Sequence, residues 1–181
     1  MPREDCKIPT IGENMTDKVL EDWKSKDISH LKGAQLCDFS YSDFAKGKIE
    51  GLTSDSVFRH CDISSVKAKS SKFENCVFSF CDFSESAFNN AEFKGCIFVG
   101  CYFTNAELQH VKFEECVIRS VVAMNTNFTH VKFLKCNVMG AFPRSKFSGA
   151  VATNCKVGKC VTSGVTYFPF SNSGVWDVNK G

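Results

Sequence analysis

An apolar side chain recurs at every fifth position through most of this chain. From Phe58 to Val138 the period runs without a slip, and a small or narrow side chain stands two positions before each of these residues. A period of five fits neither the 3.6-residue repeat of an amphipathic helix nor the two-residue alternation of a strand, because either would spread both series around its surface. The pattern therefore predicts a coil that turns a corner every five residues, with both series pointing inward.

We call the apolar series the central positions and the narrow series the thin positions. Fifteen of the eighteen phenylalanines lie at central positions, and ten of the eleven cysteines lie at thin positions. A second period of 20 residues relates Cys76, Cys96, Cys116 and Cys136. Since four corners make up this longer period, it indicates one turn of a four-faced coil.

The longer period shortens to 19 residues twice, between Cys37 and Ser56 and between Cys136 and Cys155. Each slip predicts a short corner or a local bulge. From Cys37 to Tyr167 the repeats amount to about six and a half turns, or a rod roughly 30 Å long at the usual spacing of paired strands. The fold expected is all-β, with its core formed by the repeat itself.

The two ends of such a coil need covers, since open edges and an exposed core favour aggregation. Residues 16–26 have the pattern of a short amphipathic helix with Thr16 as its N-cap, which predicts an N-terminal capping helix. We divide the chain into an N-terminal segment (1–33), the repeat coil (34–168) and a C-terminal tail (169–181). Near the C-terminal end, Phe168, Phe170 and Trp176 form either a cap or a contact with a second copy.

Charge and targeting signals single out no partner class. Lys and Arg number 22 and Asp and Glu 20, for a net charge of +2. This balance favours neither nucleic acid nor an anionic membrane. No apolar run is long enough to span a membrane, and the first residues lack the apolar region of a secretory signal. We expect a cytoplasmic protein, although delivery into a host cell stays open.

The cysteines predict buried, reduced thiols. Their spacing of five and twenty matches no zinc pattern, and straight inward series do not gather four ligands around a tetrahedral ion. We therefore expect no metal and no cofactor, with each thiol acting as a small apolar core group.

Catalysis is not expected. The histidines are His30, His60, His110 and His130, and the last two occupy equivalent outward positions one turn apart, after Asn90. No serine or cysteine has a predictable base partner, no glycine-rich phosphate loop is present, and a filled rod offers no pocket. We predict that the protein is not an enzyme.

One outward face is apolar where the fold does not require it. Apolar residues stand at equivalent outward positions on successive turns, whereas the neighbouring face carries Lys72, Glu92, Lys112 and Lys132. A contiguous apolar surface is typical of an interaction site, although β-branched residues also favour exposed strands. The predicted partner-binding residues are Val57, Val77, Phe80, Ile97, Val99, Val117 and Met139.

The repeat resembles that of the pentapeptide-repeat proteins, whose loose consensus is Ala-(Asp/Asn)-Leu-x-x. The segments 37–40 (CDFS), 81–84 (CDFS) and 106–108 (AEL) carry the resemblance. The preference for Phe at the centre and Cys before it is nearer the quinolone-resistance branch than the Ala-Leu-rich branch. The resemblance implies a right-handed quadrilateral β-helix, in agreement with the four-faced coil.

Two functions follow as hypotheses. The first is a rigid protein–protein interaction module that binds a protein partner or itself through the apolar face, without direct contact with nucleic acid or membrane. The second is implied by the resemblance, since some relatives mimic DNA and protect DNA gyrase, a type II topoisomerase. Such mimics are acidic along the rod, whereas residues 37–168 carry 15 Lys or Arg and 12 Asp or Glu. We therefore favour the first hypothesis.

Overall fold

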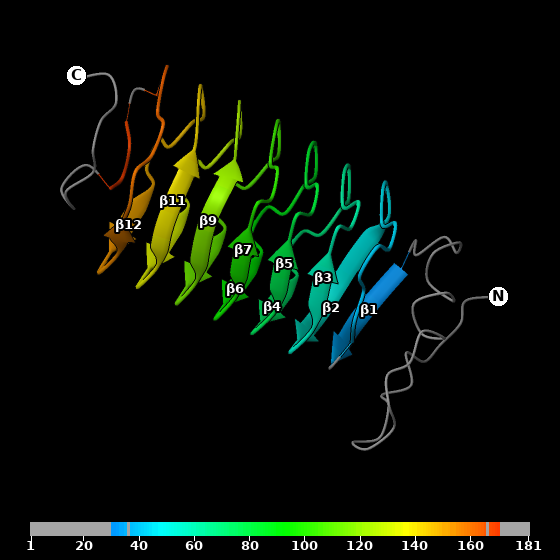
Figure 1. The fold of residues 1–181 in the computed structure, drawn as a ribbon. Coiled ribbons are helices and arrows are strands. Elements are labelled where there is room, and N and C mark those ends of the chain that lie inside the picture. The colour runs from blue at the N-terminus through cyan, green and yellow to red at the C-terminus, as the bar shows by residue number, and fades with distance from the viewer. Residues whose placement is uncertain (1–29, 36, 166, 171–181) are drawn as a thin grey trace.

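The chain winds into a parallel β-solenoid of about six turns. The computed structural model describes residues 30–35, 37–165 and 167–170. Figure 1 shows the turns stacked along one axis, from β1 in blue to β12 in orange. Across these residues the regular elements are all strands, with no helix that could cross a membrane. The all-β prediction is confirmed, and the predicted capping helix at 16–26 lies outside the described residues.

Seven strands form the first sheet, in the order β1-β2-β4-β6-β8-β10-β12. Their bounds are His30–Gln35 (β1), Lys48–Ser54 (β2), Lys72–Glu74 (β4), Glu92–Lys94 (β6), Lys112–Glu114 (β8), Lys132–Leu134 (β10) and Val151–Thr153 (β12). The first strand begins at His30 and so extends across the boundary that we predict between residues 33 and 34.

Six strands form the second sheet, in the order β13-β11-β9-β7-β5-β3. Their bounds are Val57–Arg59 (β3), Val77–Ser79 (β5), Ile97–Val99 (β7), Val117–Val122 (β9), Asn137–Ala141 (β11) and Lys156–Val157 (β13). Each strand pairs with the strand one turn away, because the corners return the chain to the same face after four repeats.

The other two faces of the solenoid are held by bridges between single residues. The outward members of the third face are Asp43, Asp62, Asp82, Tyr102, Val122, Ala141 and Val161. Those of the fourth face are Lys48, Lys67, Ala87, Glu107, Asn127 and Lys146. The four faces in chain order are therefore the first sheet, the second sheet, the third face and the fourth face.

Both predicted slips of register are present. Lys48 pairs with Lys67, 19 residues on, but Leu52 pairs with Lys72, 20 residues on, so β2 contains the first slip. The second slip lies in β11, where the pairing with β9 shifts between Met139 and Gly140. Each slip removes one corner residue without breaking the stack of turns.

The core consists of phenylalanine rings stacked from turn to turn, as the central positions predict. On the first sheet Phe73, Phe93, Phe113 and Phe133 stack with centroid distances of 5.0, 5.2 and 5.2 Å. Rings on adjacent faces meet edge to face, as Phe93 and Phe98 do at 5.3 Å. Both arrangements are favourable for aromatic quadrupoles, so the rings order the interior as well as fill it.

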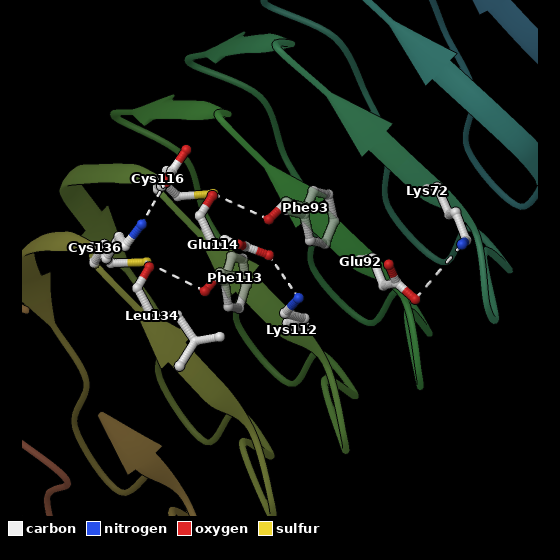
Figure 2. Close-up of polar contacts among 11 residues, drawn as sticks. Lys72, Glu92, Phe93, Lys112, Phe113, Glu114, Cys116, Leu134 and Cys136 are labelled. Carbon is white, nitrogen blue, oxygen red and sulfur yellow. Dashed lines mark hydrogen bonds and ion pairs between the residues drawn. The ribbon is translucent and has the colours of Figure 1, made fainter. Parts of the chain in front are cut away.

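The thin positions supply hydrogen bonds in addition to space. Cys116 Sγ donates to the carbonyl oxygen of Phe93 at 3.3 Å, and Cys136 Sγ donates to that of Phe113 at 3.4 Å (Figure 2). The hydroxyl of Ser71 makes the equivalent bond to the carbonyl of Ile49 at 2.6 Å. Thiol and hydroxyl groups therefore link each turn to the one before it, a role that their small volume alone does not reveal.

The C-terminal end of the described chain folds back over the last turns. The Phe170 ring is buried against Phe133 at 4.9 Å, and Phe168 lies 5.3 Å from Phe147. The intervening central position on the first sheet is Ala152, whose small side chain leaves room for Phe170. These two rings occupy the place of a cap, whereas Trp176 lies outside the described residues.

Candidate interaction surface

The second sheet brings together the apolar residues predicted to bind a partner. Val57, Val77, Ile97 and Val117 are directly paired on consecutive strands. Ile97 is 38% exposed and the three valines are half-buried. The pairing continues to Asn137 on β11, so the apolar column spans four turns and ends in a polar residue.

A second column on the same sheet is mixed. Val99 and Met139 belong to it, but Arg119 lies between them in the pairing. On the turn before, Val99 is paired with Ser79. The structure therefore places both predicted residues on the apolar face but does not join them to each other. The contiguous part of the predicted site is the column from Val57 to Val117, with Val99 beside it.

Phe80 lies at the corner between the second sheet and the third face, and its ring is 57% exposed. It stacks on His60 with a centroid distance of 5.2 Å, and His60 stacks on Tyr41 at 5.3 Å. We call these three rings the corner ladder. The sequence could reveal the ladder only through the 20-residue period and its slip, since its members are 19 and 20 residues apart.

Three further exposed apolar residues, Tyr102, Met124 and Val161, lie on the third face and were missed in the sequence. Tyr102 is 52% exposed and Met124 is 38% exposed. Tyr102 is bridged to Val122, the residue two positions before Met124. The apolar surface thus extends around the corner at Gly100 onto the third face. Extending the 20-residue period to this face would have found these residues.

The first sheet carries a balanced pattern of charge. Lys72 approaches Glu92 at 3.7 Å, and Lys112 meets Glu114 at 2.6 Å (Figure 2). The bond to Glu114 raises the pKa of Lys112, and the same bond lowers the pKa of Glu114. Opposite charges neighbour one another both along and across β4, β6 and β8. The charges on these strands therefore compensate each other within the chain.

The third face begins with a column of like charges. Asp43, Asp62 and Asp82 are bridged in register, one per turn. Each accepts a hydrogen bond from the backbone N–H two residues later, as Asp82 does from Ser84 at 2.8 Å. No ion pair between described residues includes these three carboxylates. The column gives this end of the third face a local negative charge.

Eight of the ten described thiols are buried, and hydrogen bonds between neighbouring thiols shift their pKa values in opposite directions, lowering those of Cys81 and Cys116. Hydrogen bonds with the neighbouring thiols of Cys116 and Cys76, together with burial, raise the pKa of Cys96. Burial likewise raises the pKa of Cys160. A thiol acts as a nucleophile or metal ligand only when deprotonated and accessible. These thiols are arranged for packing and hydrogen bonding.

The other groups suited to chemistry do not converge. His110 and His130 stack at 5.0 Å on equivalent corners, as their spacing predicts. Parallel stacked imidazoles present their nitrogens side by side and not toward a common point. Within the described ranges, no three side chains among His, Cys, Asp and Glu gather closely enough to hold a metal ion.

Comparison with known proteins identifies the repeat. Residues 66–143 match the family model described as a pentapeptide repeat region. The search of curated proteins found no match. Among solved structures, full-length QnrB1, a plasmid-mediated fluoroquinolone resistance protein, is 17% identical, with a TM-score of 0.41 over 82% of this chain and 94% of that one. The pentapeptide repeat protein Rfr23 from the cyanobacterium Cyanothece 51142 is 14% identical, with a TM-score of 0.26 over 70% of this chain and 85% of that one.

Proposed function

We propose that this chain, which is a pentapeptide-repeat protein, works as a non-enzymatic protein–protein interaction module. The observation that supports the proposal most is the apolar column Val57, Val77, Ile97 and Val117 on the second sheet. The charged side chains on the adjacent first sheet form ion pairs with one another. The first sheet is therefore charged on its outer surface, whereas the second sheet carries an apolar column. A solvent-facing apolar column is costly to keep exposed unless a partner covers it.

The rigidity of the solenoid suits this role. The column is carried by paired strands whose inward residues, Phe58, Phe78 and Phe98, are fully buried and stacked. The apolar residues are thus presented at fixed positions, and a partner that binds them orders little of this chain. Binding to a pre-organised surface loses less conformational entropy than binding to a mobile one.

The test is a pair of charged substitutions on the column, Val77→Glu and Ile97→Glu, with Ala87→Glu on the fourth face as a matched control. All three positions face outward. Sedimentation velocity would measure self-association, and affinity capture with mass spectrometry would identify other partners. The proposal requires that an association of the wild type is lost in both column variants and retained in the control. Association that survives in the column variants would refute it.

Binding to DNA gyrase as a DNA mimic is the alternative function. Mimicry of a phosphate backbone requires a continuous negative stripe along the rod. The column of Asp43, Asp62 and Asp82 supports this alternative, but Tyr102 follows it on the next turn. On β4, β6 and β8 of the first sheet the charges alternate in sign, and β10 adds the positive charge of Lys132 beside Lys112. We therefore rank the apolar interaction module first, and capture of a topoisomerase subunit by wild type would reverse this order.

A further inference from the structure

The apolar column of the second sheet is followed by opposite charges at its two ends. Asp38 is bridged to Val57 on the turn before the column, and Lys156 is paired with Asn137 on the turn after it. Lys156 is exposed and Asp38 is half-buried. Among the described residues, no ion pair includes either side chain. The column therefore has a negative charge at one end and a positive charge at the other.

Ile97 is the midpoint of this extended column. In the order of the turns, its members are Asp38, Val57, Val77, Ile97, Val117, Asn137 and Lys156. The midpoint lies on β7, between β5 and β9 (Figure 1). Reversing the order places the two charged ends opposite each other and Val77 opposite Val117. Because two copies share the same spacing between turns, the extended column is complementary to a second copy that runs in the opposite direction.

The other outward column of the second sheet allows the same arrangement. Reversal about Val99 places Arg119 opposite Ser79 and Arg59 opposite Met139. The long stem of an arginine can lie along an apolar side chain while its charge stays in water. No two like charges meet in this column, so it does not oppose the reversed pairing.

The corner between the first and second sheets adds a second pair of opposite charges. Its members on successive turns are Asp55, Asn75, Gly95, Glu115 and Lys135, all with positive φ. Reversal about Gly95 places Asp55 opposite Lys135. Lys135 also pairs with Glu115 of its own chain at 3.0 Å, so this corner contributes less than the free ends of the extended column.

At the opposite corner of the second sheet, Phe80 adds apolar surface beside the midpoint. Its ring leans over Gly100, because a Cβ added to this glycine would lie 2.7 Å from Cδ1 of Phe80. The ring is 57% exposed. Gly100 directly follows β7, so the two Phe80 rings of a reversed pair would both lie near its centre.

We infer that the second sheet binds a second copy of this chain, in a two-fold symmetric dimer of antiparallel solenoids with the axis at Ile97. Each contact occurs twice in such an interface, so the dimer gains two pairs between Asp38 and Lys156. This inference rests on the proposed function and names the partner. The face measures about 30 Å by about 10 Å, or about 300 Å² per copy, well below the area of a stable interface. The dimer should therefore be weak and reversible.

The test is sedimentation equilibrium up to millimolar protein concentration, where wild type should show a monomer–dimer equilibrium. Lys156→Asp sets a carboxylate against Asp38 at both ends of the interface. It should raise the dissociation constant by about twofold to thirtyfold, the range for two exposed ion pairs. The matched control is Lys146→Asp, the same change at an exposed lysine on the fourth face, which should leave the dissociation constant unchanged.

A charge exchange tests the orientation. Asp38→Lys should weaken the dimer, whereas the double variant Asp38→Lys/Lys156→Asp restores opposite charges and should recover the wild-type dissociation constant. In a parallel dimer each end meets the same end, so the exchange would restore nothing. If Asp38→Lys does not fold, because it loses the hydrogen bonds from Ser40, Asp38→Asn keeps an acceptor for them. Lys156→Asp should then cost less in the Asp38→Asn background than in wild type.

The inference is overturned if wild type stays monomeric at millimolar concentration. It is also overturned if Lys146→Asp weakens the dimer as much as Lys156→Asp, or if the charge exchange recovers nothing. A monomeric wild type that loses a different captured protein in Val77→Glu and Ile97→Glu would overturn this inference alone and support the proposed function. A dimer that persists in those two variants would refute both.

Discussion

The stacked rings of the core predict a graded loss of stability when single rings are removed. Phe93 is 2% exposed and lies between Phe73 at 5.0 Å and Phe113 at 5.2 Å, with an edge contact to Phe98 at 5.3 Å. Phe93→Ala removes the ring from a close-packed interior that cannot collapse around it, because the paired strands hold the turns apart. The free energy of unfolding should fall by about 3 to 5 kcal/mol.

Phe103→Ala is a matched control for the contribution of stacking. Phe103 is also buried, at 5% exposed, and stacks on Phe83 at 4.7 Å. The residue one turn further on this face is Ala123, so Phe103 has a stacked ring on one side only. Phe93 also has more edge and tilted ring contacts than Phe103. Removal of Phe103 should therefore cost less than that of Phe93 by at least about 0.5 to 1.5 kcal/mol, the value of one aromatic pair.

Urea unfolding of wild type and both variants, followed by far-ultraviolet circular dichroism, measures this difference. Repeat arrays can unfold in parts, so near-ultraviolet dichroism should be recorded to verify that both signals report one transition. Equal losses in the two variants would show that stacking between turns contributes nothing beyond burial. A loss below about 1 kcal/mol for Phe93→Ala would refute the assignment of the ring stack as the core.

Three further predictions concern the cap, the corner ladder and the thiols. Phe170→Ala should lower the free energy of unfolding by about 3 kcal/mol, because it uncovers the last turns. Urea titration measures this loss, and an unchanged unfolding midpoint would contradict a capping role. Phe80→Ala should cost no more than about 1 kcal/mol, since the ring is largely exposed, and a larger loss in a thermal melt would mean that the ladder is structural. Burial raises the pKa of Cys160 in the folded state, so the contribution of this thiol to stability is complete below the unfolded pKa of about 8.5 and declines as pH rises above it. Cys160→Val should therefore reduce the loss of stability between about pH 8.5 and 9.5, as measured by urea titrations at the two pH values, and an unchanged pH dependence would contradict this reasoning.

The inward half of the molecule was predictable from the sequence because it repeats. Every central position must fill the same narrow interior, so the apolar period defines the corners, the faces and both register slips. The slips at β2 and β11 follow from single missing residues in that period. For the cysteines, the sequence predicted their burial in the core but not their hydrogen bonds. Their burial follows from their spacing, but their hydrogen bonds to carbonyl groups depend on how the turns are offset along the axis.

The outward half was less predictable, because the fold places few demands on it. The four-turn column on the second sheet follows from the 20-residue period, and the structure confirms its pairing. The corner ladder and the continuation to Tyr102 escaped detection, since their members differ in residue type and share no repeating composition. The ion pair between Lys72 and Glu92 likewise depends on the conformations of the two side chains.

The sequence by itself determined the architecture: a strict five-residue period leaves only one way to bury its phenylalanines, and the 20-residue period sets four faces per turn. The tertiary structure decided which surface residues become neighbours. Stacking of turns brings side chains 19 or 20 residues apart into contact, and the direction in which each corner side chain leans determines whether it meets a ring, a charge or a bare glycine. The inward positions must be shielded from water, and any apolar residue of suitable size meets that requirement. The surface depends on particular contacts, which only the folded chain creates.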